Sequence, residues 1–316
     1  MTRFILRRLL ALVPILFGIS LLVFLMMALV PGDPAQAILG PYATEENLAR
    51  LRGELALDRP LPQQYLTWIT NVLRGDFGTS YSLDRPVIEE IRDRLGATLI
   101  LAGSAFALCT LLGLLVGTIT AVRQNEWPDR FLSVLVLLGI STPSFWLALL
   151  AVAIFSVGLG WFPATGMYSV YQGGGIVDLI SHLVLPAVTL AAVAAGVVAR
   201  LMRTGMLEVL RQDYVRTARS KGMVERRVIG HHAFRNAIIG LIPVLGIQAG
   251  FVLGGAVYVE TVFQWPGIGR ALVQAIQTRD LLLVQGAVLV LATGYVMLNL
   301  LADVLQHLLD PRLKTK

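Results

Sequence analysis

The stretch LLALVPILFGISLLVFLMMALV, residues 9–30, contains no charged side chain over its 22 residues. As an α-helix it would measure about 33 Å, and the hydrocarbon core of a bilayer is about 30 Å thick. The stretch is longer than the apolar core of a signal peptide, and it runs into Pro31-Gly32-Asp33-Pro34 rather than a cleavage site of small residues. It therefore predicts an uncleaved first membrane helix.

Five further uncharged runs follow along the chain. Of the 316 residues, 56% are hydrophobic and 15% are charged, whereas soluble domains carry about 25% charged residues. The basic residues behind the formal charge of +6 lie beside apolar runs and are not interleaved with aromatic residues, which argues against a nucleic-acid partner. We expect an all-α polytopic membrane protein with six transmembrane helices in a lipid bilayer, the five later spans being residues 96–122, 131–159, 179–199, 236–259 and 281–302.

The positions of the basic residues predict how these spans are oriented. Loops on one side contain Arg3, Arg7 and Arg8, a basic cluster between residues 203 and 235, and the basic C-terminal tail. Arginine and lysine mark the cytoplasmic side of a membrane protein, so we expect both termini on that side. Residues 123–130 contain acids as well as arginines and favour neither side.

This orientation divides the chain into segments. Between the first two spans, Thr44, Pro62 and Pro86 are suited to open three short helices, which predicts a small helical extracytoplasmic cap packed on the membrane domain. The expected segments are the N-terminus with the first helix (1–30), the extracytoplasmic segment (31–95), a five-helix core (96–306) with a cytoplasmic loop (203–235), and a cytoplasmic tail (307–316).

Glycines at a spacing of four residues predict close helix packing. Gly246, Gly250 and Gly254 recur in the fifth span, and Gly113 and Gly117 in the second. Small residues at this spacing let helix backbones approach each other in membranes. The fifth-span stripe fits either contact within this chain or contact with a partner subunit at a pore. Prolines that interrupt spans and predict kinks are Pro14, Pro143, Pro186 and Pro243.

Several chemical motifs are missing from the sequence. It has no phosphate-binding G-x-x-x-x-G-K-[ST] loop, no G-x-S-x-G and no H-E-x-x-H, and its four histidines form no ligand set. The single cysteine, Cys109, lies within an apolar run. We therefore expect no catalytic residue, no metal site and no cofactor bound by this chain. No charged residue lies in the middle of a span, which argues against an ion-coupled carrier and places the energy source outside the chain.

A short basic segment, DYVRTARSKG at residues 213–222, separates two long apolar runs. Asp213 is suited to an N-cap, and Gly222 stands where a left-handed residue ends a helix. Arg219 and Lys221 place positive charge at the negative end of the helix dipole. The segment predicts a docking helix, and an ordinary connecting helix is the alternative.

This segment resembles the EAA loop of permease subunits of bacterial ABC importers, and the whole chain is similar to the B-type permease of the dipeptide, oligopeptide and nickel branch. Two departures stand out: Arg216, Thr217 and Ala218 replace the acidic and small residues of the general pattern, and Ile239-Gly240 replaces the usual Leu-Pro. Further motifs that carry the resemblance are Pro31-Gly32-Asp33-Pro34, Leu57-Asp58-Arg59-Pro60, Gly75-Asp76-Phe77-Gly78, Arg235-Asn236-Ala237 and Glu260-x-x-Phe263-x-Trp265-Pro266-Gly267-x-Gly269-Arg270.

The resemblance implies a multi-pass subunit of the bacterial cytoplasmic (inner) membrane that forms half of a translocation pathway. Its partners would be a second, homologous permease subunit, two ATPase subunits that bind ATP and Mg, and an extracytoplasmic solute-binding protein. Residues 31–95 would either dock the binding protein or serve only as a cap, and Trp265 is also suited to an interfacial anchor. The residues implied in ATPase coupling are Asp213, Tyr214, Arg216, Thr217, Ala218, Arg219, Lys221 and Gly222.

The substrate implied by the resemblance is a di- or oligopeptide or glutathione, delivered by the binding protein. Nickel chelates and oligosaccharides are the alternatives within the same class of importers. Two other functions stay open: a secondary carrier, which would transport alone on an ion gradient, and a scaffold or membrane-enzyme subunit, which would require a polar constellation in its spans.

Overall fold

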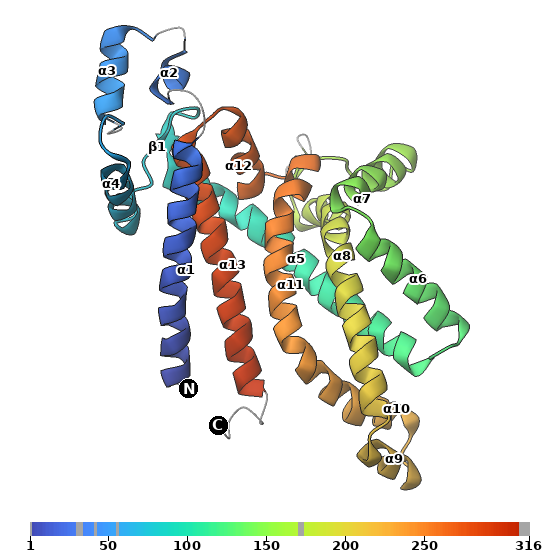
Figure 1. Ribbon diagram of the computed structural model, residues 1–316. Coiled ribbons are helices and arrows are strands. Elements are labelled where there is room, and N and C mark those ends of the chain that lie inside the picture. Colours follow the sequence, from blue (N-terminus) through green and yellow to red (C-terminus); the bar gives the residue numbers. More distant parts are fainter. Residues whose placement is uncertain (1, 30–33, 41–42, 55–56, 170–173, 310–316) are drawn as a thin grey trace. The chain divides into compact units, whose positions relative to one another are not determined.

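The computed structural model describes residues 2–29, 34–40, 43–54, 57–169 and 174–309, and these form helices almost throughout (Figure 1). Residues 31–33 of the first motif and 310–316 of the predicted tail lie outside the described residues. The elements are α1 (Thr2–Ala28), α2 (Pro34–Leu39), α3 (Glu45–Glu54), α4 (Leu61–Leu73), β1 (Thr79–Ser80), β2 (Arg85–Pro86), α5 (Val87–Val122), α6 (Trp127–Ser141), α7 (Ser144–Ala151), the π-helix η2 (Val152–Gly158), α8 (Ile176–Leu210), α9 (Asp213–Ser220), α10 (Glu225–Arg227), the π-helix η3 (Val228–Phe234), α11 (Arg235–Val262), α12 (Ile268–Gln277) and α13 (Leu281–Leu309).

Five of the described helices are long and apolar enough to cross a membrane: Leu6–Ala28, Val87–Val122, Ile176–Leu210, Glu225–Val262 and Leu281–Leu308. The run at 131–159, expected to be one span, instead forms Trp127–Ser141 and Ser144–Gly158, which are bent by 109°. The break lies at Thr142, whose backbone is extended, and Pro143, which has no N–H to continue the helix. The described residues thus contain five candidate spans and one bent pair.

The chain divides into two compact units, which are described separately. The first contains Met1–Thr98 and Pro266–Gly294, and the second contains Leu99–Trp265 and Tyr295–Lys316. The helices α5 and α13 each contribute to both units.

In the first unit, α4 lies against α1. The sequence predicted α4 as a cap helix with one apolar face, and α1 covers part of that face. Tyr65 is buried, and its hydroxyl lies 2.8 Å from the hydroxyl of Ser20. The Phe24 ring meets Tyr65 edge-on at 5.5 Å and stacks with Trp68 at 6.1 Å. The α4 helix therefore covers part of the first predicted span.

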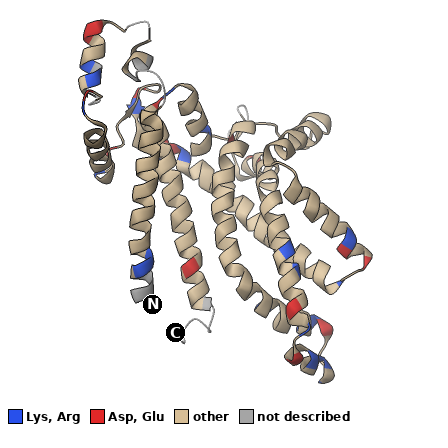
Figure 2. Ribbon diagram, in the orientation of Figure 1, with Lys and Arg blue, Asp and Glu red and all other residues tan. Residues whose placement is uncertain are grey.

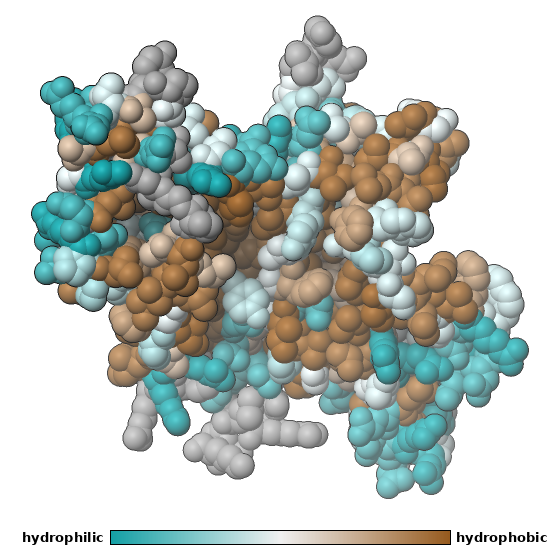
Figure 3. Space-filling view, turned by 45° about the horizontal axis from the view of Figure 1, so that its top comes forward, coloured by the Kyte–Doolittle hydropathy of each residue, from teal (hydrophilic) through white to brown (hydrophobic). Residues whose placement is uncertain are grey.

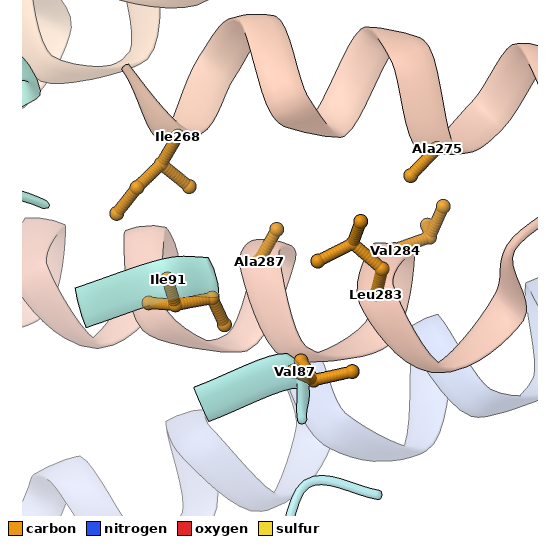
Figure 4. Packing of buried hydrophobic residues seen from close by; sticks show 7 residues of the cluster. All are labelled: Val87, Ile91, Ile268, Ala275, Leu283, Val284 and Ala287. Carbon is orange, nitrogen blue, oxygen red and sulfur yellow. The ribbon is translucent and has the colours of Figure 1, made fainter. Parts of the chain in front are cut away.

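The buried core of the first unit joins the beginning of α5 to α12 and α13. Its members are Val87, Ile91, Ile268, Ala275, Leu283, Val284 and Ala287 (Figure 4). Because α5 runs without a break from Val87 to Val122, the predicted boundary at residue 95 falls inside a helix. The predicted third cap helix and the second span are one element.

A two-stranded hairpin precedes α5 and departs from the all-α prediction. Thr79 pairs with Pro86 and Ser80 with Arg85 in antiparallel register. The buried carboxylate of Asp280 accepts hydrogen bonds from Ser80 Oγ at 2.5 Å, from Ser82 Oγ at 2.8 Å and from the Ser82 N–H at 3.1 Å. Asp280 therefore fixes the hairpin to the connection between α12 and α13.

In the second unit, α8 is the central helix and packs against α6, α7 and α11. A buried cluster beneath it joins α5, α8, η3 and α11: Ala121, Val198, Met202, Met206, Ala233, Ala237 and Leu241. These contacts cover the half of α8 that leads to α9. The predicted docking helix therefore extends from a well-packed element.

Candidate functional site

The helix α9 begins at Asp213, and two residues connect it to the end of α8 at Leu210. Asp213 is its first residue and not its N-cap, which corrects the sequence prediction. Gln212 occupies the N-cap position with an extended backbone and makes no side-chain capping bond. The Asp213 carboxylate lies instead 3.5 Å from Arg216 Nη2. Its negative charge in the first turn also interacts favourably with the positive end of the helix dipole.

The C-terminal end of α9 is closed by a Schellman motif. Gly222 has φ +74° and donates its N–H to the Arg219 carbonyl at 2.9 Å. The Met223 N–H is bonded to the Ala218 carbonyl at 3.3 Å. This pair of bonds needs a left-handed residue at Gly222, as the sequence predicted.

One face of α9 is anchored by apolar side chains. Val215 and Ala218, three residues apart, are buried together with Val228 from η3. Val209 and Leu210 from the end of α8, and Met223, pack around them. The end of α8, the whole of α9 and the start of η3 therefore form one small packed body.

The opposite face of α9 is exposed and rich in charge. The Arg216 side chain is 77% exposed, and Tyr214, Thr217 and Lys221 are exposed beside it. Charged residues gather at α9, α10 and the adjoining end of α8, whereas the neighbouring spans are almost free of charge (Figure 2). The surface there is hydrophilic next to an apolar helical body (Figure 3). This face is suited to a polar protein partner.

Arg219 has a different environment from Arg216. Its Nη2 and Nε donate to the two carboxylate oxygens of Glu225, at 2.7 and 3.2 Å. The hydrogen bond to Glu225 raises the pKa of Arg219 above its already high value. Arg219 thus closes the turn between α9 and α10, and Arg216 is the more available cation.

The predicted glycine faces contact helices of this same chain at four of five positions. A Cβ added at Gly113 would lie 2.6 Å from Val198, and one at Gly117 would lie 2.5 Å from the Ala199 carbonyl, both on α8. At Gly246 and Gly250 the nearest atoms belong to Ala302 and Tyr295 of α13, at 2.2 and 2.3 Å. Nothing described lies within 4 Å of such an atom at Gly254.

Sequence reasoning missed one ion pair close to the predicted docking helix. Asp129 at the start of α6 accepts two hydrogen bonds from the Arg203 guanidinium on α8. The sequence showed only that residues 123–130 were balanced in charge, and Arg203 was counted among loop residues. A distance of 74 residues along the chain separates the partners, so no local pattern marks the pair. In the ranges that the structure describes, no group of histidine, cysteine or acidic residues is arranged to hold a metal ion.

The helical spans and their chemistry define a multi-pass membrane protein, and α9 exposes a basic face beside them. The particular family follows from the sequence comparisons. Residues 113–315 match the family described as the binding-protein-dependent transport system inner membrane component, and residues 1–102 match the N-terminal part of such membrane components. The chain belongs to this family and is a multi-pass inner-membrane transport subunit.

Full-length relatives support the same family. The glutathione transport system permease protein GsiC of Salmonella paratyphi A is 43% identical over 316 residues, 100% of both chains. A protein of Brucella abortus named as a peptide transport system permease is 44% identical over 314 residues, 99% of both chains. A chain of the inward-facing MetNI methionine ABC transporter has a TM-score of 0.55 at 17% identity, covering 70% of this chain and 96% of that one, and so shares its fold.

Proposed function

We propose that this chain is a permease subunit of an ATP-driven ABC importer and forms half of a translocation pathway for peptides or glutathione. The observation that carries the proposal is α9: a basic helix closed at its C-terminal end by a Schellman motif, fixed by Val215 and Ala218 and exposed on its other face. A second, homologous permease subunit would complete the pathway. Two ATPase subunits would bind ATP and Mg, and a solute-binding protein would deliver the substrate.

In this proposal α9 sits in a cleft of an ATPase subunit and transmits its closure to the membrane helices. The Schellman end and the buried Val215, Ala218 and Val228 suit α9 to this role, because a rigid, packed helix passes on a displacement that a loose loop would absorb. The residues proposed for ATPase coupling are those that the resemblance implied: Asp213, Tyr214, Arg216, Thr217, Ala218, Arg219, Lys221 and Gly222. Of these, Ala218 acts by anchoring α9, because its side chain is buried.

We further propose six crossings with both termini in the cytoplasm, the bent pair α6 and α7 with η2 counting as one crossing. Residues 31–95 then lie outside, and 203–235 and the tail lie inside. The native Cys109 is buried, so new cysteines can report on the two sides. A membrane-impermeant maleimide should label Leu73→Cys in intact spheroplasts and Lys221→Cys only after lysis; the reverse pattern would overturn this topology.

Peptides and glutathione are the substrates that the proposal favours. The Salmonella relative is named for glutathione transport and the Brucella relative for peptide transport, and each aligns over essentially the whole chain. Nickel chelates and oligosaccharides are the alternatives. These candidates are distinguished by measuring the uptake of radiolabelled glutathione and of a radiolabelled dipeptide. In each assay the other candidate substrates are added unlabelled as competitors.

The decisive experiment starts with the tagged chain purified in mild detergent from its native host. We expect a second permease and ATPases in the complex by mass spectrometry. Reconstituted in proteoliposomes with the binding protein, the complex should take up glutathione or dipeptide only when ATP is supplied. A chain that purifies alone and transports on an ion gradient would refute the proposal in favour of a secondary carrier.

A further inference from the structure

Asp129 is held by a set of hydrogen bonds that its neighbours do not share. Its carboxylate accepts from Arg203 Nη2 at 2.8 Å and from Arg203 Nε at 3.1 Å. The Asn125 N–H donates to the same carboxylate at 2.9 Å, and Ser133 Oγ at 3.2 Å. The Asp129 side chain is only 5% exposed and that of Arg203 is 34% exposed. A bidentate, largely buried pair of this kind has a defined geometry, unlike an exposed ion pair.

The same two helices are in close contact further along. A Cβ added at Gly196 of α8 would lie 2.6 Å from Ile140 Cγ1 and 3.2 Å from the Val136 carbonyl of α6. A Cβ at Gly139 of α6 would lie 3.3 Å from the Ala192 carbonyl of α8. Such close backbone approach leaves no room for one helix to slide past the other without repacking. The α6 helix is thus fixed to α8 near both of its ends.

The end of α8 is in turn fixed to the docking helix. Arg203 lies two helical turns before Leu210, where α8 ends. From there, Val209 and Leu210 enter the apolar cluster that buries Val215 and Ala218 of α9. A continuous chain of contacts therefore leads from α9 through α8 and Arg203 to Asp129 and α6.

We infer that Asp129 and Arg203 are positioning residues that make α6 move with α8 and α9 as one body during the transport cycle. The inference rests on the proposed function, because it assumes that an ATPase displaces α9. Without the ion pair, the packing around Gly139 and Gly196 would still join the 15-residue helix α6 to α8, but the Asp129 end of α6 would lose its charged link to Arg203. A displacement of α9 would then reach α6 incompletely, and ATP hydrolysis would be less tightly coupled to transport.

A disulfide between α6 and α8, formed in two states of the transport cycle, tests whether these helices stay together. The variant Cys109→Ala removes the single cysteine, and Ile140→Cys with Gly196→Cys places two β-carbons near the separation of about 3.5–4.5 Å that a disulfide requires. In the complete complex, we expect equal disulfide yields without nucleotide and after trapping with ATP and vanadate, and ATP hydrolysis within twofold of the reduced form. A yield that differs severalfold between the two states, or no disulfide in either, would overturn the inference.

The ion pair itself is tested by Asp129→Asn in the otherwise unchanged complex. We expect glutathione or dipeptide uptake per ATP hydrolysed to fall at least fivefold at an unchanged amount of assembled complex. The matched control is Glu126→Gln. This variant also removes an acidic side chain near the start of α6, but the ion pair that Glu126 forms with Arg123 is well exposed. A purely structural role would reduce uptake and hydrolysis together and leave their ratio at the wild-type value, which would refute a positioning role.

The two proposals fail in different ways. If the wild-type chain assembles with no ATPase or shows no ATP-dependent uptake, the proposed function is wrong. If the wild-type complex transports normally but the disulfide yield changes between states, the importer function stands and the one-body inference is wrong.

Discussion

Replacing Gly117 by alanine should destabilise the protein by an amount set by the contact between α5 and α8. The added Cβ would lie 2.5 Å from the Ala199 carbonyl oxygen and 2.6 Å from Met202 Cβ. Ordinary contact begins at 3.4 Å, so the helices must separate by about 0.9 Å. The obstacle is backbone and a fully buried side chain, which do not give way cheaply. Overpacking of this kind costs about 1–3 kcal/mol.

The matched control is Gly103→Ala on the same helix, because nothing lies within 4 Å of a Cβ added there. Both variants gain the helix preference of alanine over glycine, about 1 kcal/mol, so their difference isolates the steric cost. We expect Gly117→Ala to lose monodispersity on size-exclusion chromatography at a temperature about 2–6 °C below that of Gly103→Ala. Equal midpoints would show that the α5–α8 contact is not close-packed and would refute the reasoning.

Three further predictions address other contacts. Asp280→Asn should weaken the hairpin by about 1–3 kcal/mol, because Ser80 loses a charged acceptor, and limited proteolysis should cut the hairpin faster; unchanged cleavage would argue against it. Arg216→Glu should lower binding-protein-stimulated ATP hydrolysis at least fivefold with normal membrane insertion, since this side chain is exposed and closes no turn; wild-type stimulation would remove it from the docking surface. Tyr65→Phe should lower the free energy of unfolding by about 0.5–1.5 kcal/mol, because it removes the hydrogen bond to Ser20. The loss should appear as a lower thermal midpoint, and a midpoint equal to wild type would mean that water replaces this bond.

The sequence predicts the spans well because the bilayer restricts what an uncharged run can form. A backbone without water must satisfy its own hydrogen bonds, so an apolar run of sufficient length is a helix. The C-terminal end of α9 was equally predictable, because the left-handed backbone at Gly222 favours glycine. In both cases the information is local.

Where tertiary contacts decide, prediction from the sequence was incomplete. Pro143 predicts a kink in the helix. The proline alone does not determine the angle of 109° between the two helical segments, because that angle depends on what α6 and α7 pack against. Trp265, which is suited to a membrane interface, is completely buried instead, and the interfacial-anchor interpretation is wrong. The bond from Ser80 to Asp280 joins residues 200 positions apart, beyond the reach of any periodic pattern.

The bend after α6 also has a consequence for how the chain is made. With 15 residues, α6 measures about 22 Å and is shorter than the roughly 30 Å hydrocarbon core. Its partner α8 begins only at Ile176, so the ribosome delivers α6 and α7 to the translocon before α8 exists. Until α8 has been made, neither the Arg203 side chain nor the glycine contacts are available to α6. A nascent chain arrested before Ile176 leaves α6 without the helix that holds it through Asp129 and the glycine contacts.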